Sequence, residues 1–198
     1  GEQRKIQDGI YTVTGRDTDG SVITSTLDSD ERRVIPSTQW RVASHDSTQY
    51  GSRMLMRFIP DRRFPFPKSL YAVEDALRFF LADKPDAVVV DFCAGSGTTA
   101  HAVMRLNHQD GGHRRSIMVT NNEVSATEET SLRRKGHRPG DPEWEALGIC
   151  DYITKPRIEA AITGLTPSGE PIRGEYQFTD PFPMADGLEA VSYTHLRA

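Results

Sequence analysis

The sequence is poor in the features that define several protein classes. Its 198 residues include only two cysteines, Cys93 and Cys150, and no uninterrupted apolar run longer than four residues. Two distant cysteines are too few for a disulfide framework or a zinc cluster, and a membrane-spanning helix needs about 18 consecutive apolar residues. No secretory hydrophobic segment opens the chain. Acidic and basic residues nearly balance, 28 against 24, so no overall charge attracts phosphate groups. We therefore expect a reducing, cytoplasmic environment.

The remaining composition is that of a folded domain, with 36% hydrophobic and 26% charged residues. Residues 1–50 predict a β-rich segment, with a strand over residues 10–15 and a turn at Asp19-Gly20. Pro36 makes residues 32–43 an edge strand or a broken one. The last residues, 191–198, resemble translated sequencing-adapter read-through, and we expect a non-native tail there.

An alternation of helices and strands begins at Ser69. Leu70, Val73 and Leu77 recur at helical spacing, and Ser69 is a suitable N-cap. Residues 87–90 are apolar and β-branched, which predicts a strand buried on both faces. A glycine turn, a helix from Thr99 to about residue 107 and a second strand over residues 116–120 follow. This order predicts a right-handed βαβ unit with a parallel sheet covered by helices.

The following region is more polar but keeps clear helix signals. Ser125, with Glu128 three residues later, predicts a helix over residues 125–135. A turn is expected at residues 138–140, a helix from Pro156 to Gly164, and a hairpin turn at residues 168–169.

The motif that carries chemistry is the segment DFCAGSGTTA, residues 91–100. Gly95, Gly97 and Ala100 match the glycine pattern of dinucleotide-binding enzymes, which leaves an oxidoreductase open. However, Asp91 ends the strand and would repel a pyrophosphate, whereas it suits a ligand with a cationic group. No lysine follows the glycines, so a Walker-type phosphate loop is excluded.

S-adenosylmethionine carries an ammonium, a sulfonium and a ribose, and these groups match the pattern. Asp91 can bind the ammonium, and Gly95 and Gly97 would let the backbone approach the cofactor without a Cβ in the way. Glu123 follows the second strand and is placed to accept hydrogen bonds from the ribose hydroxyls. Two acids at adjacent strand ends predict a cofactor site between them.

Four segments together resemble a known family: FPFPKSLYAVEDALRFF, DFCAGSGTTAHAVMRLN, RRSIMVTNNE and GICDYITKPRIEAAITG. In this order they resemble permuted (β-class) DNA amino-methyltransferases, close to the adenine-specific modification subunits of type III restriction-modification systems. The resemblance covers about residues 51–190. It implies an α/β fold, namely the Rossmann-like S-adenosylmethionine-dependent methyltransferase fold in incomplete form, with a small β-rich N-terminal segment that belongs to a target-recognition or intervening region.

The resemblance also implies site residues and partners. Phe66, Pro67 and Lys68 would wall the cofactor pocket, although Ser69 stands where the family has a proline. The predicted cofactor-binding residues are Pro67, Lys68, Asp91, Phe92, Ala94, Gly95, Ser96, Gly97, Thr98, Thr99 and Glu123. Thr98 and Thr99 would offer hydroxyls to the cofactor or cap the helix. The implied partners are double-stranded DNA and a restriction or helicase subunit, and a homodimer is compatible with the family.

The family's catalytic tetrapeptide, Asp or Asn followed by two prolines and an aromatic residue, is absent from the sequence. The nearest strings, at residues 141–144 and 180–183, break the pattern, and Asp141 fits a helix N-cap instead. In the permuted order the tetrapeptide lies before the glycine motif, so we expect it upstream of Gly1. We therefore predict no catalytic residue in this chain, cofactor binding without efficient methyl transfer, and no metal site.

Three alternatives stay open at this level. Cytosine N4 methylation uses the same cofactor machinery, a dinucleotide-dependent oxidoreductase shares the glycine pattern, and a non-catalytic DNA-binding remnant would rely on the basic stretches. His101 is expected to be solvated or capping and Cys93 to be a buried small side chain.

Overall fold

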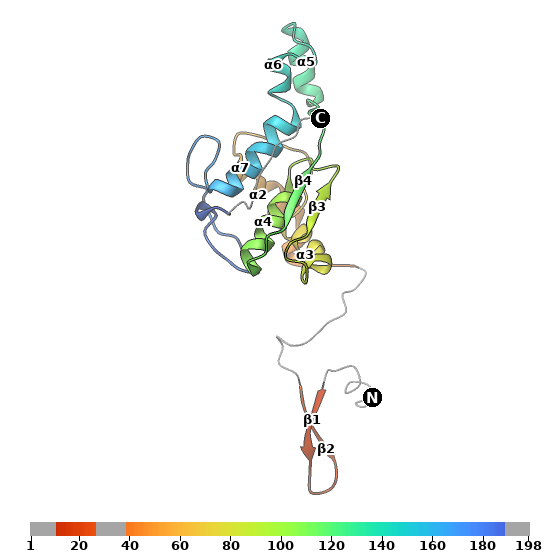
Figure 1. Ribbon diagram of the computed structural model, residues 1–198. Coiled ribbons are helices and arrows are strands. Elements are labelled where there is room, and N and C mark those ends of the chain that lie inside the picture. Colours follow the sequence, from red (N-terminus) through yellow and green to blue (C-terminus); the bar gives the residue numbers. More distant parts are fainter. Residues whose placement is uncertain (1–10, 27–38, 189–198) are drawn as a thin grey trace. The chain divides into compact units, whose positions relative to one another are not determined.

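The computed structural model describes residues 11–26 and 39–188 (Figure 1). The chain divides into two compact units, Gly1–Trp40 and Arg41–Ala198. The predicted boundary after residue 50 remains a prediction, and the expected tail at residues 191–198 lies outside the described residues.

The first unit contains the predicted hairpin. Strands β1 (Tyr11–Arg16) and β2 (Val22–Thr26) pair antiparallel, with an irregularity between Val13 and Gly15. The turn is closed by the Gly20 amide, which donates to the Asp17 carbonyl at 2.9 Å, and Gly20 has φ +86°. A glycine suits this left-handed conformation, which confirms the turn at Asp19-Gly20.

The β-rich character expected up to residue 50 does not extend that far. Most of the expected strand at residues 32–43 lies outside the described residues. Its described part, residues 39–43, is not a strand, because helical turn η1 (Ala43–His45) begins at its last residue and η2 (Thr48–Arg53) follows. The physical reason is the Asp46 carboxylate, which accepts a hydrogen bond from the Gln49 amide at 2.8 Å and so initiates a helical turn.

The second unit is a mixed α/β structure built around one parallel strand pair. Strand β3 (Val88–Asp91) pairs with β4 (Arg115–Met118), and helix α4 (Thr98–Asp110) connects them. Helix α3 (Leu70–Leu81) packs against α4. The predicted parallel pairing is confirmed, and β4 ends two residues earlier than expected. This pair places the carboxyl ends of both strands on one edge, where the glycine turn begins.

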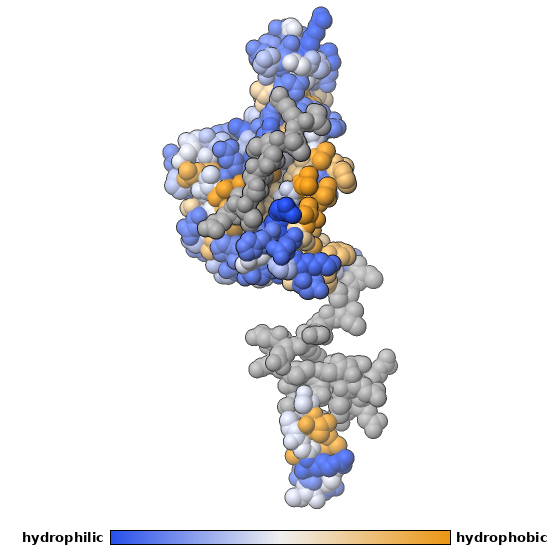
Figure 2. All heavy atoms as spheres, viewed as in Figure 1, coloured by the Kyte–Doolittle hydropathy of each residue, from blue (hydrophilic) through white to orange (hydrophobic). Residues whose placement is uncertain are grey.

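One face of this strand pair is open, which corrects the expectation of a strand buried on both faces. Val88 and Val90 are 47% and 45% exposed, and Ile117, in register with Val90, is 46% exposed. Figure 2 shows apolar surface over β3 and β4. Among the described residues α4 contacts β4, and α3 packs against α4. Along each strand, exposed residues alternate with half-buried ones, as in a strand with one open face.

Local capping signals set the ends of several helices. Ser69 accepts a hydrogen bond from the Ala72 amide at the start of α3, and Ser125 accepts one from Glu128 at the start of α5. The remaining helical elements are α2 (Met54–Phe58), α5 (Ala126–Arg134), α6 (Pro142–Glu145), η3 (Cys150–Thr154), α7 (Lys155–Thr163) and η4 (Met184–Asp186). Gly164, with φ +72°, ends α7 as predicted. The expected turn at residues 168–169 is confirmed by the Gly169 amide, which donates to the Thr166 carbonyl.

The apolar core lies between α2, α3, α4, α7 and the segment that follows α7. Met118 of β4 packs against it, so the core covers one face of the strand pair. Its buried members are Met54, Phe58, Leu70, Tyr71, Ala100, Ala102, Met104, Ile158, Ala160, Ala161, Ile172, Tyr176, Met184 and Leu188. Among the described residues, no helix is both long and apolar enough to span a bilayer.

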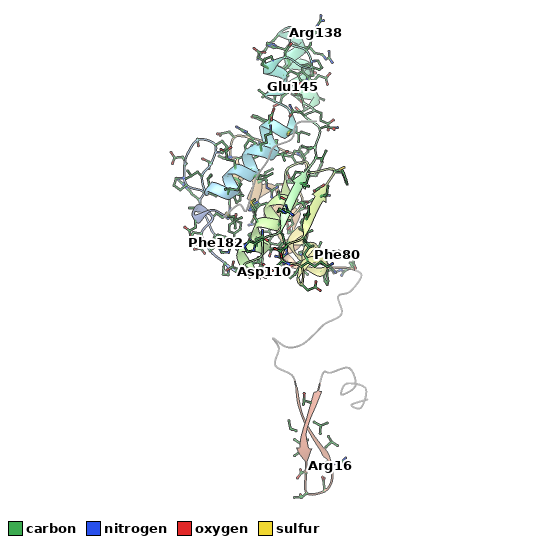
Figure 3. The ribbon with its side chains drawn as sticks, in the orientation of Figure 1. Arg16, Phe80, Asp110, Arg138, Glu145 and Phe182 are labelled. Carbon is green, nitrogen blue, oxygen red and sulfur yellow. The ribbon has the colours of Figure 1, made fainter. Side chains whose placement is uncertain are left out.

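A buried polar cluster fastens the C-terminal segment to this core. Arg105 of α4 is fully buried and donates to Glu74 of α3 and to the carbonyls of Thr179 and Asp180. The Phe182 ring, labelled in Figure 3, stacks on His108 of α4, with 4.1 Å between the ring centroids. A charged residue is buried here because both a carboxylate and backbone carbonyls compensate it.

Candidate cofactor site

Asp91 lies at the carboxyl end of β3 and is half-buried. One carboxylate oxygen accepts a hydrogen bond from the Cys93 amide at 2.9 Å, and the other accepts one from the Thr99 hydroxyl at 2.6 Å. Both donors are neutral, and no ion pair involves Asp91 in the part of the chain that the structure describes. The carboxylate therefore keeps an uncompensated negative charge that can attract a cationic group.

The glycine turn follows directly and leads into α4. Gly95 and Gly97 have φ values of +50° and +75°, which a side chain rarely adopts. The Ala94 amide donates to the Val119 carbonyl, which holds the turn against the end of β4. Within residues 11–26 and 39–188, the amides of Gly95 and Ser96 have no acceptor, so they are two unpaired donors next to the helix start. Ser96 itself is buried.

The space beside the two glycines is filled by protein, which corrects the reason given for them. A Cβ on Gly95 would lie 3.2 Å from the Phe64 ring, and a Cβ on Gly97 would lie 3.2 Å from Ile158 and 3.3 Å from Thr154. Glycine is required here because the backbone is left-handed and because these side chains pack against it. The groups of the turn that could bind a ligand are its unpaired backbone amides.

The three hydroxyls of the turn are engaged by protein. Thr99 donates to Asp91, whereas Ser96 and Thr98 are buried and accept hydrogen bonds from Arg157 at 2.9 Å and 2.7 Å. Neither hydroxyl caps α4, whose N-cap position is Gly97, and the predicted hydrogen bonds of Thr98 and Thr99 to the cofactor remain predictions. Their hydroxyls fix the shape of the turn.

Glu123 follows the carboxyl end of β4, which lies on the same edge of the strand pair as the carboxyl end of β3. Met118 and Asp91 are in register at the ends of the two parallel strands, and Glu123 follows five residues after Met118. Its carbonyl accepts a hydrogen bond from the Ile149 amide at 3.0 Å, and the residue is exposed. Both predicted acids thus follow the carboxyl ends of neighbouring strands, and their roles remain predictions.

The three residues predicted to line the cofactor pocket differ in how exposed they are. Phe66 has φ +53° and is 91% exposed, Pro67 is buried and Lys68 is exposed. The side chain of this segment that contacts the turn is Phe64, at the Gly95 position. The aromatic-proline pattern pointed to the correct segment, but which of its aromatic residues reaches the turn depends on tertiary packing.

Two further expectations about the turn and α4 are wrong. Cys93 is exposed rather than buried, like the neighbouring Phe92, which is 76% exposed at the end of the open sheet face. His101 is fully buried rather than solvated, and its Nε2 lies 2.7 Å from the hydroxyl of Tyr176. Burial, with the nearby Arg157 and Arg105, lowers the pKa of His101 well below its usual value.

Sequence reasoning missed a set of residues on η3 and α7 that contact the glycine turn through hydrogen bonds and side-chain packing. The Thr154 hydroxyl donates to the Gly95 carbonyl at 2.5 Å, and Arg157 donates to Ser96 and Thr98. Ile158 packs at Gly97. Thr154, Arg157 and Ile158 share one helical face, and that spacing was the available signal, although nothing local indicated its partner about 60 residues earlier.

The two strings nearest to the catalytic tetrapeptide have structural roles. Asp141 occupies the N-cap position of α6 as predicted, and its carboxylate accepts a hydrogen bond from the Arg138 amide at 2.7 Å. Asp180 pairs with His108 at 2.6 Å. Neither carboxylate is placed as a free acceptor for an amine.

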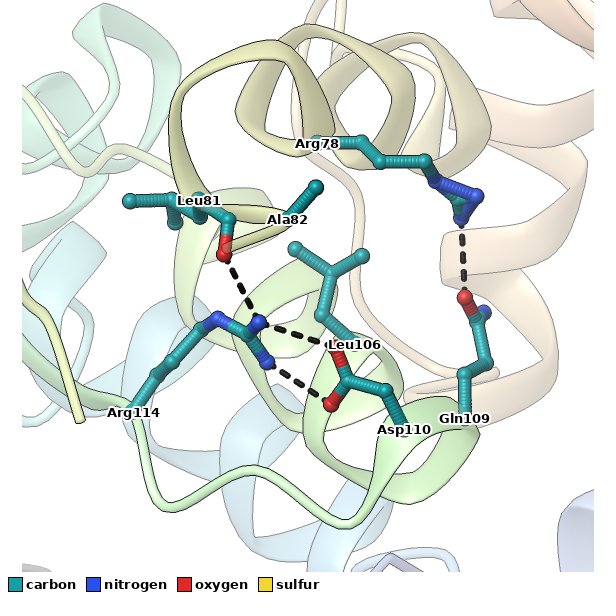
Figure 4. A pocket seen from close by; sticks show the side chains of 7 residues that line it. All are labelled: Arg78, Leu81, Ala82, Leu106, Gln109, Asp110 and Arg114. Carbon is teal, nitrogen blue, oxygen red and sulfur yellow. Dashed lines mark hydrogen bonds and ion pairs between the residues drawn. The ribbon is translucent and has the colours of Figure 1, made fainter. Parts of the chain in front are cut away.

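A separate cavity of about 170 Å³ lies at the other end of α4 (Figure 4). Its lining residues are Arg78, Leu81, Ala82, Leu106, Gln109, Asp110 and Arg114. Arg114 binds both oxygens of Asp110 at 2.8 Å, so the charges of this cavity are paired within the protein. Helix α4 separates the cavity from the glycine turn by about 18 Å, at 1.5 Å per residue. In the described ranges, no cluster of His, Cys, Asp and Glu side chains could hold a metal.

Comparison with known proteins gives partial but significant matches. The chain is 34% identical over 103 residues to the type II methyltransferase M.KpnI of Klebsiella pneumoniae, a match that covers 52% of this chain and 24% of that protein. It is 43% identical over 74 residues to the StyLTI Mod subunit of Salmonella typhimurium, a type III restriction-modification enzyme, covering 37% of this chain and 11% of the relative. The EcoPI Mod subunit of Escherichia phage P1, another type III enzyme, is 35% identical over 89 residues, or 45% of this chain and 13% of its own length.

These matches confirm the resemblance to methyltransferases of restriction-modification systems. The aligned stretches span no more than about a quarter of the length of these relatives. No family model matches the chain.

Proposed function

We propose that this chain is the cofactor-binding part of a site-specific DNA methyltransferase of a restriction-modification system, and that the complete enzyme methylates the N6 amine of adenine. The observation that carries the proposal lies at the carboxyl end of β3. There the Asp91 carboxylate has only neutral partners, next to the unpaired amides of Gly95 and Ser96 among the described residues. The similarity to modification methyltransferases supports the same conclusion.

The charges of the turn fit the amino-acid end of S-adenosylmethionine. Asp91 would hold the ammonium group, and the amides of Gly95 and Ser96 at the start of α4 would donate to the carboxylate. Glu123, at the end of the neighbouring strand, would accept hydrogen bonds from the ribose hydroxyls. We infer that β3, α4 and β4 are one βαβ unit of the Rossmann-like methyltransferase fold.

The bound cofactor would supply a methyl group on a sulfonium, which an amine displaces in line. This chain's own residues would hold the cofactor and orient it, and the positioning of the flipped adenine would depend on residues elsewhere in the complete enzyme. Double-stranded DNA is the proposed substrate, and a restriction or helicase subunit is the proposed partner. Cytosine N4 methylation remains the nearest variant, because it would use the same cofactor residues.

Equilibrium dialysis with labelled S-adenosylmethionine and labelled NAD tests the proposal. We expect S-adenosylmethionine to bind and NAD to bind much more weakly, because Asp91 repels a pyrophosphate. Tighter binding of NAD would support a dinucleotide-dependent enzyme instead. Salt-dependent binding of duplex DNA without any cofactor affinity would support a DNA-binding remnant.

A methyl-transfer assay on adenine-containing duplex DNA tests whether the catalytic residues lie outside this chain. We expect little or no transfer by this chain alone, because its sequence has no acceptor tetrapeptide for the amine. Efficient transfer would show that the catalytic residues lie within these 198 residues.

A further inference from the structure

One helical segment, formed by η3 and α7, contacts the glycine turn. Thr154 of η3 donates to the carbonyl of Gly95, and the side chain of Ile158 of α7 packs where a Cβ of Gly97 would lie. Between these two contacts, Arg157 donates through one nitrogen, Nη1, to the Ser96 carbonyl at 3.2 Å and to the Ser96 and Thr98 hydroxyls. The contacts of Arg157 thus fall on the two residues that flank Gly97.

Arg157 is an unusual choice for a residue that only fills the core. It is fully buried, and among the described residues it forms no ion pair with a carboxylate. Its Nε and Nη2 have no hydrogen-bond partner there. Burial lowers the pKa of its guanidinium to about 10. A buried charge without a counterion costs stability, so an apolar side chain of similar volume would stabilise the fold at least as well.

The contacts of Arg157 explain what the charge contributes. The donors of the turn are backbone amides, whose directions depend on the dihedral angles of residues 95–98, and Gly97 at φ +75° would be free to change conformation. Arg157 bonds to both neighbours of this glycine and so restricts that freedom. Its positive charge also lies next to Thr98, the first residue of α4, where it adds to the partial positive charge of the helix end.

We propose that Arg157 is a positioning residue that holds the glycine turn in its cofactor-binding conformation through Ser96 and Thr98. This inference rests on the proposed function, because it assigns a task to Arg157 at the same cofactor site. Arg157 acts through the turn and does not touch the cofactor, since its side chain is fully buried.

The experiment compares Arg157→Met with Arg105→Met, a matched control in the same core. Both arginines are fully buried, but Arg105 contacts Glu74 and the C-terminal segment and makes no contact with the turn. Circular dichroism gives the folded fraction, and calorimetry gives the affinity for S-adenosylmethionine. We expect Arg157→Met to weaken binding about tenfold, the effect of losing one to two hydrogen bonds, while folded Arg105→Met binds like the unmodified chain.

A second readout does not depend on cofactor binding. Hydrogen exchange of the amides of residues 95–99 should become about tenfold faster in Arg157→Met, whereas exchange in the C-terminal half of α4 should change little. Arg157→Lys keeps a donor and should restore part of both effects. Where Arg157→Met does not fold, Ser96→Ala with Thr98→Val removes the same hydroxyl acceptors from the other side.

The possible outcomes distinguish failure of the positioning role from failure of the proposed function. Unchanged exchange at residues 95–99 in a folded Arg157→Met variant overturns the positioning role, and so does an unchanged cofactor affinity. Equal losses of affinity in folded Arg157→Met and folded Arg105→Met would show a general structural effect and would also overturn it. If the unmodified chain binds no S-adenosylmethionine, the proposed function fails and the cofactor role of Arg157 fails with it, while the exchange data still decide whether Arg157 holds the turn.

Discussion

The two ends of helix α4 differ in whether their charged side chains are paired with a counterion. At its C-terminal end Arg114 binds Asp110 through two hydrogen bonds, and in the middle Arg105 pairs with Glu74. At its N-terminal end Asp91 has only neutral partners, and Arg157 has no counterion among the described residues. A paired charge is compensated within the fold, whereas a buried charge without a counterion costs stability. Asp91, which is only half-buried, keeps a charge that can attract a ligand. The difference supports the proposal that the cofactor binds at the N-terminal end of α4.

The largest expected effect concerns the paired half. Glu74→Gln removes the charge that compensates Arg105 and should lower the free energy of unfolding by about 4 kcal/mol, because a buried cation loses its counterion. Asp75→Asn, the neighbouring acid on α3, is the control, because its partly exposed pair with His45 is worth less than about 1 kcal/mol. Urea unfolding measures both variants. Equal effects of the two changes would contradict the role of Glu74 as the counterion of the buried Arg105.

A pair of glycine substitutions compares the two ends directly. Gly97 and Gly111 both have left-handed backbones, with φ values of +75° and +68°, but only Gly97 has neighbours at the Cβ position. We expect Gly111→Ala to cost about 1 kcal/mol from backbone strain alone. Gly97→Ala should cost about 3 kcal/mol, because the contact with Ile158 adds overpacking.

Thermal unfolding and cofactor titration distinguish the two glycine variants. Gly97→Ala should also weaken cofactor binding, whereas Gly111→Ala should leave it unchanged. The interpretation of the glycine turn would be wrong if Gly111→Ala were the more damaging change.

The third prediction concerns pH. His101 is buried among Arg157 and Arg105, which lowers its pKa in the folded state, so the unfolded chain binds a proton that the folded chain does not. Stability should therefore fall as the pH drops below the unfolded value of about 6.5. His101→Gln should remove this part of the pH dependence, and His113→Gln, an exposed control, should not. Identical pH profiles for the two variants would contradict the assignment.

The smallest effect is expected at the surface of the cavity. The hydrogen bond from Arg114 holds the pKa of Asp110 below its usual value, so this pair contributes stability at neutral pH that is lost as the pH falls below about 4. Because the Asp110 side chain is 42% exposed, Asp110→Asn should cost less than about 1 kcal/mol at pH 7 and a smaller amount at pH 3. Urea midpoints at the two pH values measure the difference. A loss larger than that of Glu74→Gln would reverse the expected order.

The parts of the fold that were predictable depend on local chemistry. Ser69 and Ser125 cap their helices, Gly164 ends α7, and Asp19-Gly20 forms the hairpin turn, because each of these signals acts within a few residues. The glycine motif, the parallel strand pair and the positions of the two acids followed from the same local order.

The parts that could not be predicted depend on distant contacts. The exposure of Val88 depends on which helices cover the strand pair, and the burial of His101 depends on Tyr176, which lies 75 residues later. Arg157 looked like an ordinary helix residue, since its partners Ser96 and Thr98 are about 60 positions away. Burial and pairing of polar residues are tertiary properties, and the local sequence pattern does not contain them.

The most direct measurement of the central claim is a hydrogen-exchange footprint of S-adenosylmethionine on the unmodified chain. The account predicts slower exchange at the amides of residues 94–99 and around Glu123 when the cofactor is added, with no change around Arg78, Asp110 and Arg114. Protection confined to the cavity at the C-terminal end of α4, with the glycine turn unaffected, would contradict it.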